Sequence, residues 1–287
     1  MYLENVSSEC RAPEYVNKRL SDIGITLIHP IVDILNYIMV DIGQPMHAYD
    51  ADKINGEITI RMAKDKEIMS ALDGNKYKLN SENIVVSDSS QIMSLAGIIG
   101  SEEISVSGNT KNILVESAFF TPSAMANKAR ILKLQTESSH RFERGVDYNL
   151  PREALVYLSQ IIEENKICDF SNINLIDHEH CIPQEKKVKI NQDNIRKSIG
   201  IDISDEAIIN ILLSAGCKFD KKSNTVLNPS YRYDLGIHAD YVEEVARLYG
   251  YDNIPVTSER INIEPSKKYI PFKITCLLYT SPSPRDS

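Results

Sequence analysis

A histidine in the segment GQPMHAYD, residues 43–50, is the first residue whose type and setting could do chemistry. Gly43 and Pro45 break a preceding helix, so we expect His47 on a turn or at a strand entry, facing a cleft. Histidine titrates near neutral pH and can act as a base or as a hydrogen-bond donor. No carboxylate stands at dyad spacing, and Asp50 is only a loose candidate. We therefore predict that His47 orients a substrate or a water; the alternative is a turn histidine without function.

A glutamate in the segment NILVESAFF, residues 112–120, is the second candidate. Its neighbours Val115 and Ala118 are apolar, so the Glu116 carboxylate must be either partnered or functional. The alternative is a strand glutamate that faces solvent. Gly97 in LAGIIG would let the backbone approach a flat ring closely, although an ordinary bulge glycine would leave the same sequence.

Two further clusters contain possible metal ligands. Carboxylates within eleven residues would offer the oxygen ligands that magnesium prefers, but acidic groups in a first helical turn also stabilise the helix dipole. These carboxylates are Asp234, Asp240, Glu243 and Glu244. In the second cluster, DHEHC at 177–181, His178 and His180 would share one face of a strand. No second ligand cluster follows at zinc spacing, so we interpret it as a linker.

The elements that must position these residues form two bodies. In the first, helices are predicted over 13–24, 30–43, 121–134 and 149–165, and strands over 57–63, 76–80, 83–89 and 112–120. In the second, which starts near Val188, helices are predicted over 191–200, 204–216 and 239–250, with a strand inside 225–234. The pattern predicts an α+β fold: a body with a largely antiparallel or mixed sheet to about residue 180, then a small, winged-helix-like α+β module.

The composition narrows the possible functions. Apolar residues make up 42% of the chain, enough for a core, and the net charge is −8, unsuited to coating nucleic acid through bulk electrostatics. The sequence shows neither a bilayer-spanning apolar run nor a signal-peptide pattern, and we expect no membrane partner. Its five cysteines are scattered and odd in number, which predicts reduced thiols in the cytoplasm.

The last twelve residues, CLLYTSPSPRDS, differ from the rest of the chain. They are rich in serine and proline and have no hydrophobic periodicity. The string Cys276–Asp286 matches the translation of a transposase-type sequencing-library adapter. We therefore expect residues 276–287 to be an artefact of adapter read-through, with a natural disordered tail as the alternative.

Five segments of the chain resemble, in order and spacing, the bacterial phenylalanyl-tRNA synthetase beta subunit. They are VDILNYIMVDIGQPMHAYDADKI, LAGIIG, NILVESAFF, LQTESSHRFERGVD and PSYRYDLGIHADYVEEVARLYGYDNIP. The resemblance covers residues 2–275 and implies a fragment with an N-terminally truncated B3/B4 editing region (1–180), a linker (181–187) and a B5 module (188–257). Residues 258–275 would lead to the catalytic-like core, which the chain lacks.

The function implied by this resemblance is hydrolytic editing of mischarged tyrosyl-tRNA(Phe), together with tRNA and subunit binding. A site that hydrogen-bonds the tyrosine hydroxyl discriminates strongly against phenylalanine, because bound phenylalanine would leave the polar group of the site unpaired. The resemblance implies that Glu116 reads this hydroxyl, beside His47 and Gly97. Thr136 and Ser138 offer hydroxyl groups suited to binding an acyl-tRNA end. Helix capping is the alternative role, and both roles can hold at once.

One position departs from the resembled family. The segment Val32–Tyr37 reads VDILNY where the family usually reads VDVTNY, and the family's threonine lies in the editing pocket. At this position Leu35, which precedes the site residue Asn36, lacks the hydroxyl, so a polar contact to substrate or water would be lost. Leu35→Thr is then expected to preserve or improve editing.

A basic segment provides the candidate contacts with tRNA. Five basic residues oppose only Glu137 and Glu143, a local charge of 5 − 2 = +3 that could bind acceptor-end phosphates; a solvated helix face is equally plausible. They are Lys128, Arg130, Lys133, Arg141 and Arg144.

Cofactors and partners also follow from the resemblance. It implies that Asp234, Asp240, Glu243 and Glu244 hold magnesium shared with the alpha subunit. ATP would serve the intact alpha2-beta2 heterotetramer and would not be bound by this fragment. The expected partners are the alpha subunit and tRNA(Phe), without DNA. A non-catalytic, stand-alone binding or structural module of the B3/B4 type is the alternative function.

Overall fold

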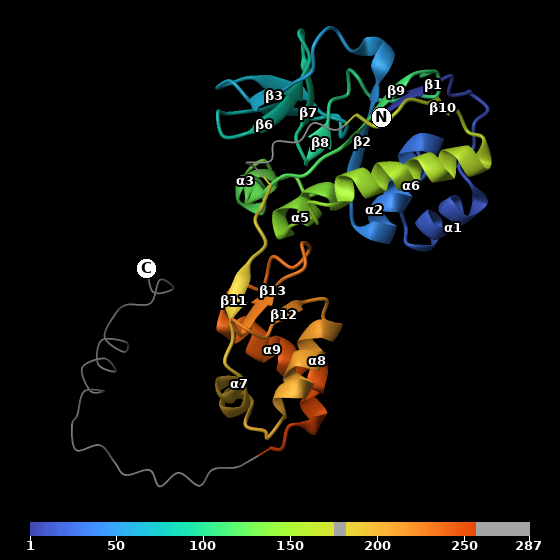
Figure 1. The fold of residues 1–287 in the computed structure, drawn as a ribbon. Coiled ribbons are helices and arrows are strands. Elements are labelled where there is room, and N and C mark those ends of the chain that lie inside the picture. Colours follow the sequence, from blue (N-terminus) through green and yellow to red (C-terminus); the bar gives the residue numbers. More distant parts are fainter. Residues whose placement is uncertain (175–181, 257–287) are drawn as a thin grey trace, which may run out of the picture.

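The computed structural model describes residues 1–174 and 182–256 (Figure 1). The candidate cluster at 177–181 and the segment 276–287 lie outside the described residues. The described part has the predicted α+β fold, in which helices accompany small sheets whose strand pairs are all antiparallel. Among the described helices, none combines the length and apolar character that a membrane crossing requires.

The first sheet has the strand order β10-β1-β9-β2. Its strands are β1 (Tyr2–Glu4), β2 (Met46–Asp50), β9 (Ile113–Ser117) and β10 (Asp169–Phe170). Helices α1 (Glu14–Asp22), α2 (Pro30–Ile42) and α6 (Leu150–Asn165) lie together on one side of it in Figure 1. Their apolar faces and alternate residues of the strands, such as Ala48 and Val115, form the first core.

The second sheet, of order β3-β6-β7-β8, lies on the other side of the β2–β9 pair. Its strands are β3 (Thr59–Met62), β6 (Ile84–Ser87), β7 (Ile92–Leu95) and β8 (Ile99–Gly100), and β4 (Ile68–Ser70) and β5 (Lys76–Lys78) form a separate hairpin. A 3₁₀ turn, η1 (Ala51–Lys53), follows β2. Because side chains alternate along a strand, Tyr49 and Leu114 point into the second core while Ala48 and Val115 point into the first.

The segment after β9 corrects one prediction. Residues 121–134 form two short helices, α3 (Pro122–Met125) and α4 (Lys128–Ile131), rather than one. Between them Asn127 has a φ of +63°, a left-handed conformation that a continuous helix does not allow. A further helix, α5 (Glu137–Arg144), follows, with Thr136 as its N-cap.

The second unit, residues 187–253, has its own core around α9 (His238–Tyr249). It contains β11 (Lys187–Lys189), α7 (Gln192–Ile199), α8 (Asp205–Ser214), β12 (Lys218–Asp220), β13 (Thr225–Leu227) and the 3₁₀ turn η3 (Tyr251–Asn253), with strand order β11-β13-β12. It contacts the first unit, which comprises residues 1–174, through Tyr233, whose hydroxyl donates to the carbonyl oxygen of Val146 at 3.1 Å.

Candidate functional site

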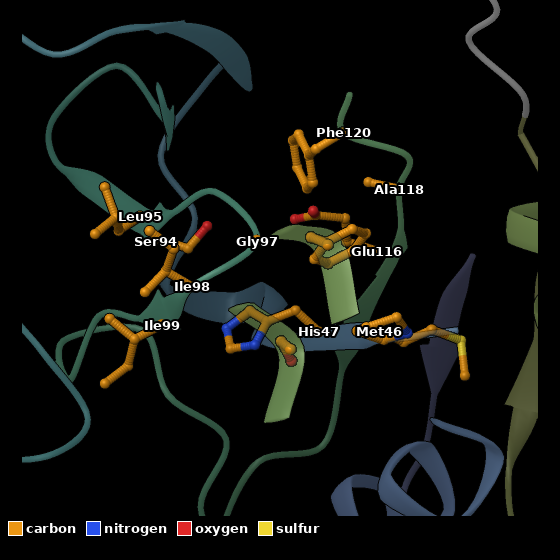
Figure 2. A pocket seen from close by; sticks show the side chains of 13 residues that line it. Met46, His47, Ser94, Leu95, Gly97, Ile98, Ile99, Glu116, Ala118 and Phe120 are labelled. Carbon is orange, nitrogen blue, oxygen red and sulfur yellow. The ribbon is translucent and has the colours of Figure 1, made fainter. Parts of the chain in front are cut away.

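A pocket of about 370 Å³, a volume that includes the open solvent at its mouth, lies where the two sheets of the first unit meet (Figure 2). Strands β2, β7, β8 and β9, the turn after β7 and helix α5 contribute its walls. The lining residues are Pro45, Met46, His47, Ser94, Leu95, Gly97, Ile98, Ile99, Glu116, Ala118, Phe120, Ser138 and Phe142. The structure therefore brings together four of the predicted residues, namely His47, Gly97, Glu116 and Ser138.

His47 and Glu116 are direct partners across the β2–β9 ladder. Residues directly opposite each other in an antiparallel pair share one face, and both of these side chains line the pocket. Asp50, the loose dyad candidate, is instead occupied at the far end of β2, where its carboxylate accepts from the Thr110 hydroxyl at 2.7 Å. His47 therefore has Glu116, not Asp50, as its nearest acidic neighbour on the strand pair.

The imidazole of His47 is held by aromatic and glycine contacts. Its ring meets the Tyr49 ring edge to face, with centroids 4.6 Å apart and an interplanar angle of 74°. A Cβ on Gly100 would lie 2.4 Å from two atoms of the imidazole, so only glycine fits there. Burial lowers the pKa of His47 to about 4, which leaves the ring neutral at physiological pH. Gly100, the second glycine of LAGIIG, was not predicted from the sequence as a site residue.

Among the described residues, the Glu116 carboxylate is bound at one of its two oxygens. Its Oε2 accepts from the Tyr49 hydroxyl at 2.5 Å, and the Tyr49 oxygen is also 2.8 Å from Ser94 Oγ. Within residues 1–174 and 182–256, Oε1 takes part in no hydrogen bond. Burial raises the pKa of Glu116, and the hydrogen bond from Tyr49 opposes that rise. Neither Tyr49 nor Ser94 was predicted from the sequence as a site residue.

Gly97 forms the wall of the pocket opposite β9. Its φ of +68° lies in the left-handed region, which favours glycine. An added Cβ would lie 2.9 Å from Met125 Cε, 3.0 Å from Phe120 Cδ2 and 3.1 Å from Phe142 Cδ2. Both the backbone conformation and the close approach of two aromatic rings therefore require glycine at this position.

The two predicted hydroxyl residues have different positions. Thr136 caps α5: its Oγ1 accepts from the Ser139 amide at 3.0 Å and donates to the Ile98 carbonyl at 2.8 Å. These bonds hold α5 against the turn after β7, and Thr136 is not a lining residue. Ser138 lines the pocket, with its hydroxyl 4.0 Å from the sulfur of Met39.

Leu35 and Asn36 lie on α2, outside the set of lining residues. The Leu35 side chain is 3% exposed and packs in the first core, away from the Glu116 face of β9. Asn36 is partly buried. A threonine at position 35 would place its hydroxyl among apolar groups, so the structure gives no reason to expect that Leu35→Thr improves this pocket.

The basic segment divides into paired and exposed residues. Lys128 forms an ion pair with Glu82 at 2.6 Å, and Arg141 forms one with Glu137 at 2.6 Å. The remaining three, Arg130, Lys133 and Arg144, are exposed to solvent around α4 and α5.

The four acidic residues of the second unit line one hollow, but most are already occupied. Both Asp234 oxygens accept from Arg232, and Asp240 Oδ2 accepts from the amides of Gly236 and Ile237 at 2.7 and 2.8 Å. Glu244, the third acidic group, is 2.8 Å from Arg232 Nη1 and 2.6 Å from Arg247 Nη2.

These carboxylates do not fit a magnesium ion within this chain. Arg232 and Arg247 supply positive charge where a cation would have to bind, and only Glu243 has no partner among the described residues. In the described part of the chain, no three acidic, histidine or cysteine side chains are grouped as a metal site requires. Arg232 and Arg247, which were not predicted from the sequence, make this an ion-pair cluster.

Comparison with known families agrees with this architecture. The sequence matches the B3/4 domain family over residues 1–168 and the tRNA synthetase B5 domain over residues 188–251. The chain therefore belongs to the B3/4 domain family, with a B5 domain following in the same polypeptide.

Its curated relatives carry the name phenylalanine–tRNA ligase beta subunit, which confirms the resemblance inferred from the five sequence segments. The Photorhabdus laumondii protein is 40% identical over 257 residues, which is 88% of this chain and 32% of that protein. The Acinetobacter baylyi protein is 36% identical over 268 residues, 92% of this chain and 34% of that protein. The chain thus spans about a third of the length of the curated relatives it matches.

A solved structure was also matched. It is an N-terminal fragment of the phenylalanyl-tRNA synthetase beta subunit from Pyrococcus horikoshii. Its sequence is 18% identical, the match covers 87% of this chain and 70% of that chain, and the TM-score is 0.36.

Proposed function

We propose that this chain is the editing region of a phenylalanine–tRNA ligase beta subunit and hydrolyses the ester bond of tyrosyl-tRNA(Phe). One observation carries the proposal: Glu116 presents a carboxylate oxygen, which has no partner among the described residues, to a pocket walled by Leu95, Phe120 and Phe142. An aromatic side chain fits such walls, and a phenol hydroxyl can donate to Oε1. Phenylalanine has no such donor and would leave the carboxylate desolvated and unpaired, which disfavours its binding.

His47 would position the ester or the attacking water. A general base works best when its pKa lies near the working pH, and the partly buried His47 has a pKa of about 4. At neutral pH it is a neutral imidazole beside Glu116, able to hold a water or an ester oxygen by hydrogen bonding. This supports the positioning role over that of a strong base.

The wider activity belongs to the complete enzyme. We propose that aminoacylation with ATP takes place only after assembly with an alpha subunit in the cytoplasm, and that tRNA(Phe) reaches the pocket past exposed Arg130, Lys133 and Arg144. The described cysteines Cys10, Cys168 and Cys217 are free thiols, which suits a reducing compartment. A magnesium site between subunits would need Asp234 and Glu244 to leave their arginines.

Deacylation by the purified chain tests the proposal. Tyrosyl-tRNA(Phe) should lose its amino acid faster than phenylalanyl-tRNA(Phe), and Glu116→Ala should reduce that preference roughly 10- to 100-fold, as expected for loss of a hydrogen bond to a charged group. His47→Ala should slow hydrolysis of tyrosyl-tRNA(Phe) by about tenfold or more, because the reacting groups lose their alignment.

The matched control is Glu57→Ala, which removes an exposed glutamate outside the pocket and should leave both rates unchanged. A folded chain that binds tRNA(Phe) without hydrolysing either ester would refute the proposal. That result would favour the alternative of a stand-alone binding module.

A further inference from the structure

Tyr49 is a buried residue with a specific polar role beneath the pocket. Its side chain is 2% exposed and does not line the pocket, so it cannot itself contact a ligand. Its hydroxyl nevertheless lies between two lining residues, 2.5 Å from Glu116 Oε2 and 2.8 Å from Ser94 Oγ. It therefore connects the two walls of the pocket from below.

The direction of these hydrogen bonds follows from counting protons. A tyrosine hydroxyl carries one proton, and an ionised carboxylate can only accept. Tyr49 thus donates to Glu116, and Ser94 must donate to the Tyr49 oxygen. The resulting chain, from Ser94 through Tyr49 to Glu116, turns Oε2 toward the interior and leaves Oε1 for the pocket.

We propose that Tyr49 is a positioning residue that sets the specificity of this pocket: it fixes Glu116 so that Oε1 alone accepts a hydroxyl from a phenolic ligand. The inference rests on the proposed function and deepens it. It assigns the selection of a phenol over a plain phenyl ring to a pair, Tyr49 and Glu116, rather than to Glu116 alone.

The charge of the pair supports this assignment. Burial raises the pKa of Glu116, and the hydrogen bond from Tyr49 works against that rise, so Tyr49 keeps Glu116 more ionised than its surroundings alone would allow. The pKa of Tyr49 is itself raised well above its ordinary value by burial and by Glu116, which keeps it a donor throughout the working pH range. An ionised acceptor penalises a ligand without a donor more than a neutral acid does.

Binding of two amides by the full chain provides the main test. L-tyrosinamide and L-phenylalaninamide, followed by NMR titration, report the preference for a phenol without requiring hydrolysis. Tyr49→Phe should reduce the ratio of their affinities by about tenfold, and Ser94→Ala should reduce it by a smaller factor. Tyr157→Phe is the matched control, because it removes a tyrosine–carboxylate bond of 3.0 Å to Asp41 on the α2–α6 side and should leave the ratio unchanged.

Titration of the Glu116 side-chain carbon by ¹³C NMR gives a second readout. Tyr49→Phe should move the midpoint to higher pH, and the acid limb of tyrosyl-tRNA deacylation should move in the same direction. An unchanged affinity ratio together with an unchanged Glu116 midpoint in a folded Tyr49→Phe chain would overturn the inference. If Tyr49→Phe does not fold, an unchanged ratio and midpoint in Ser94→Ala would overturn it instead.

Failure of the proposed function would give a different set of results from failure of the inference about Tyr49. In that case the parent chain would leave tyrosyl-tRNA intact, while the amide ratio and the Glu116 titration would still respond to Tyr49→Phe. Equal binding of both amides by the parent chain would overturn the inference as well as weaken the proposed function.

Discussion

Two glutamates, Glu116 in the pocket and Glu244 in α9, have the same side chain and opposite electrostatic settings. Glu116 has one neutral partner, and burial raises its pKa. Glu244 is also buried, with 5% of its side chain exposed, but hydrogen bonds from Arg232 and then Arg247 lower its pKa to about 2 despite that burial. Burial alone therefore does not determine what a buried carboxylate does.

The hydrogen-bond donors of the two carboxylates explain why their pKa values are shifted in opposite directions. Tyr49 has one proton to donate, so it occupies one oxygen of Glu116 and leaves the negative charge uncompensated and open to a ligand. Arg232 and Arg247 neutralise Glu244 through several charge-assisted bonds, so little is left for a cation. A carboxylate held by a neutral donor is thus suited to recognition, and one held by arginines is suited to structure.

The largest expected effect concerns stability. Glu244→Gln leaves two guanidinium groups without their shared counter-charge and should lower the free energy of unfolding of the second unit by about 3 kcal/mol, the low end for a broken buried ion pair because both arginines are partly exposed. Glu116→Gln should change the stability of the first unit by less than about 1 kcal/mol, since the amide oxygen still accepts from Tyr49. Hydrogen exchange resolved by peptide reports each unit separately.

An equal loss of stability on substitution of Glu116 and of Glu244 would contradict the proposed difference between the two sites. If Glu116→Gln cost as much as Glu244→Gln, the pocket carboxylate would be a structural group like its counterpart. Arg247→Ala serves as a control, because the Arg247 side chain is 50% exposed and Arg232 still binds Glu244 after its removal.

Much of the fold was predictable because local signals mark the ends of helices. Helix α2 begins at Pro30 and ends at Ile42, and the next residue, Gly43, is the expected left-handed cap with a φ of +84°. The strands were harder, since their pairing depends on distant residues: Tyr49 pairs with Leu114, and Tyr2 pairs with the same residue from the other side. The break at Asn127 also has no strong local signal.

The candidate site was predicted in part. His47, Glu116 and Gly97 were identified as chemical types and do meet in one pocket. Tyr49 was missed because its role depends on a strand register, although its spacing of two residues from His47 predicts a shared face once β2 is known. Arg247, three residues after Glu244 on α9, was a helix-spacing signal for the ion pair.

An effect of intermediate size is expected in the stability of the second unit at acid pH. The pKa of Glu244 is lowered to about 2, so its stabilising contribution is complete above the unfolded-state pKa and is lost as pH falls through the folded-state value. The second unit should lose on the order of 2 kcal/mol between about pH 5 and pH 2, and Glu244→Gln should lack that component. Hydrogen exchange of α9 across this range is the measurement.

The pocket should respond to pH in the opposite sense. Because the pKa of Glu116 is raised, the folded chain holds this proton more tightly than the unfolded chain; the resulting stabilisation is fully present below the unfolded-state pKa and is lost as pH rises through the folded-state pKa. Glu116→Gln should therefore remove a loss of stability that sets in as pH rises. The same direction of pH dependence for both glutamates would contradict the assignment of their partners.

The smallest expected change in stability belongs to Glu243, and it separates folding from assembly. Among the described carboxylates of the cluster, Glu243 alone has no partner, so Glu243→Gln should alter the free energy of unfolding by less than about 0.5 kcal/mol. Glu244→Gln cannot test assembly in the same way, because the loss of its two arginine bonds also weakens the fold. If the hollow faces an alpha subunit across magnesium, Glu243→Gln should weaken co-purification with that subunit at limiting magnesium while hydrogen exchange in α9 stays unchanged. Assembly at the parent level under those conditions would remove Glu243 from the interface and leave the cluster a purely structural network of ion pairs.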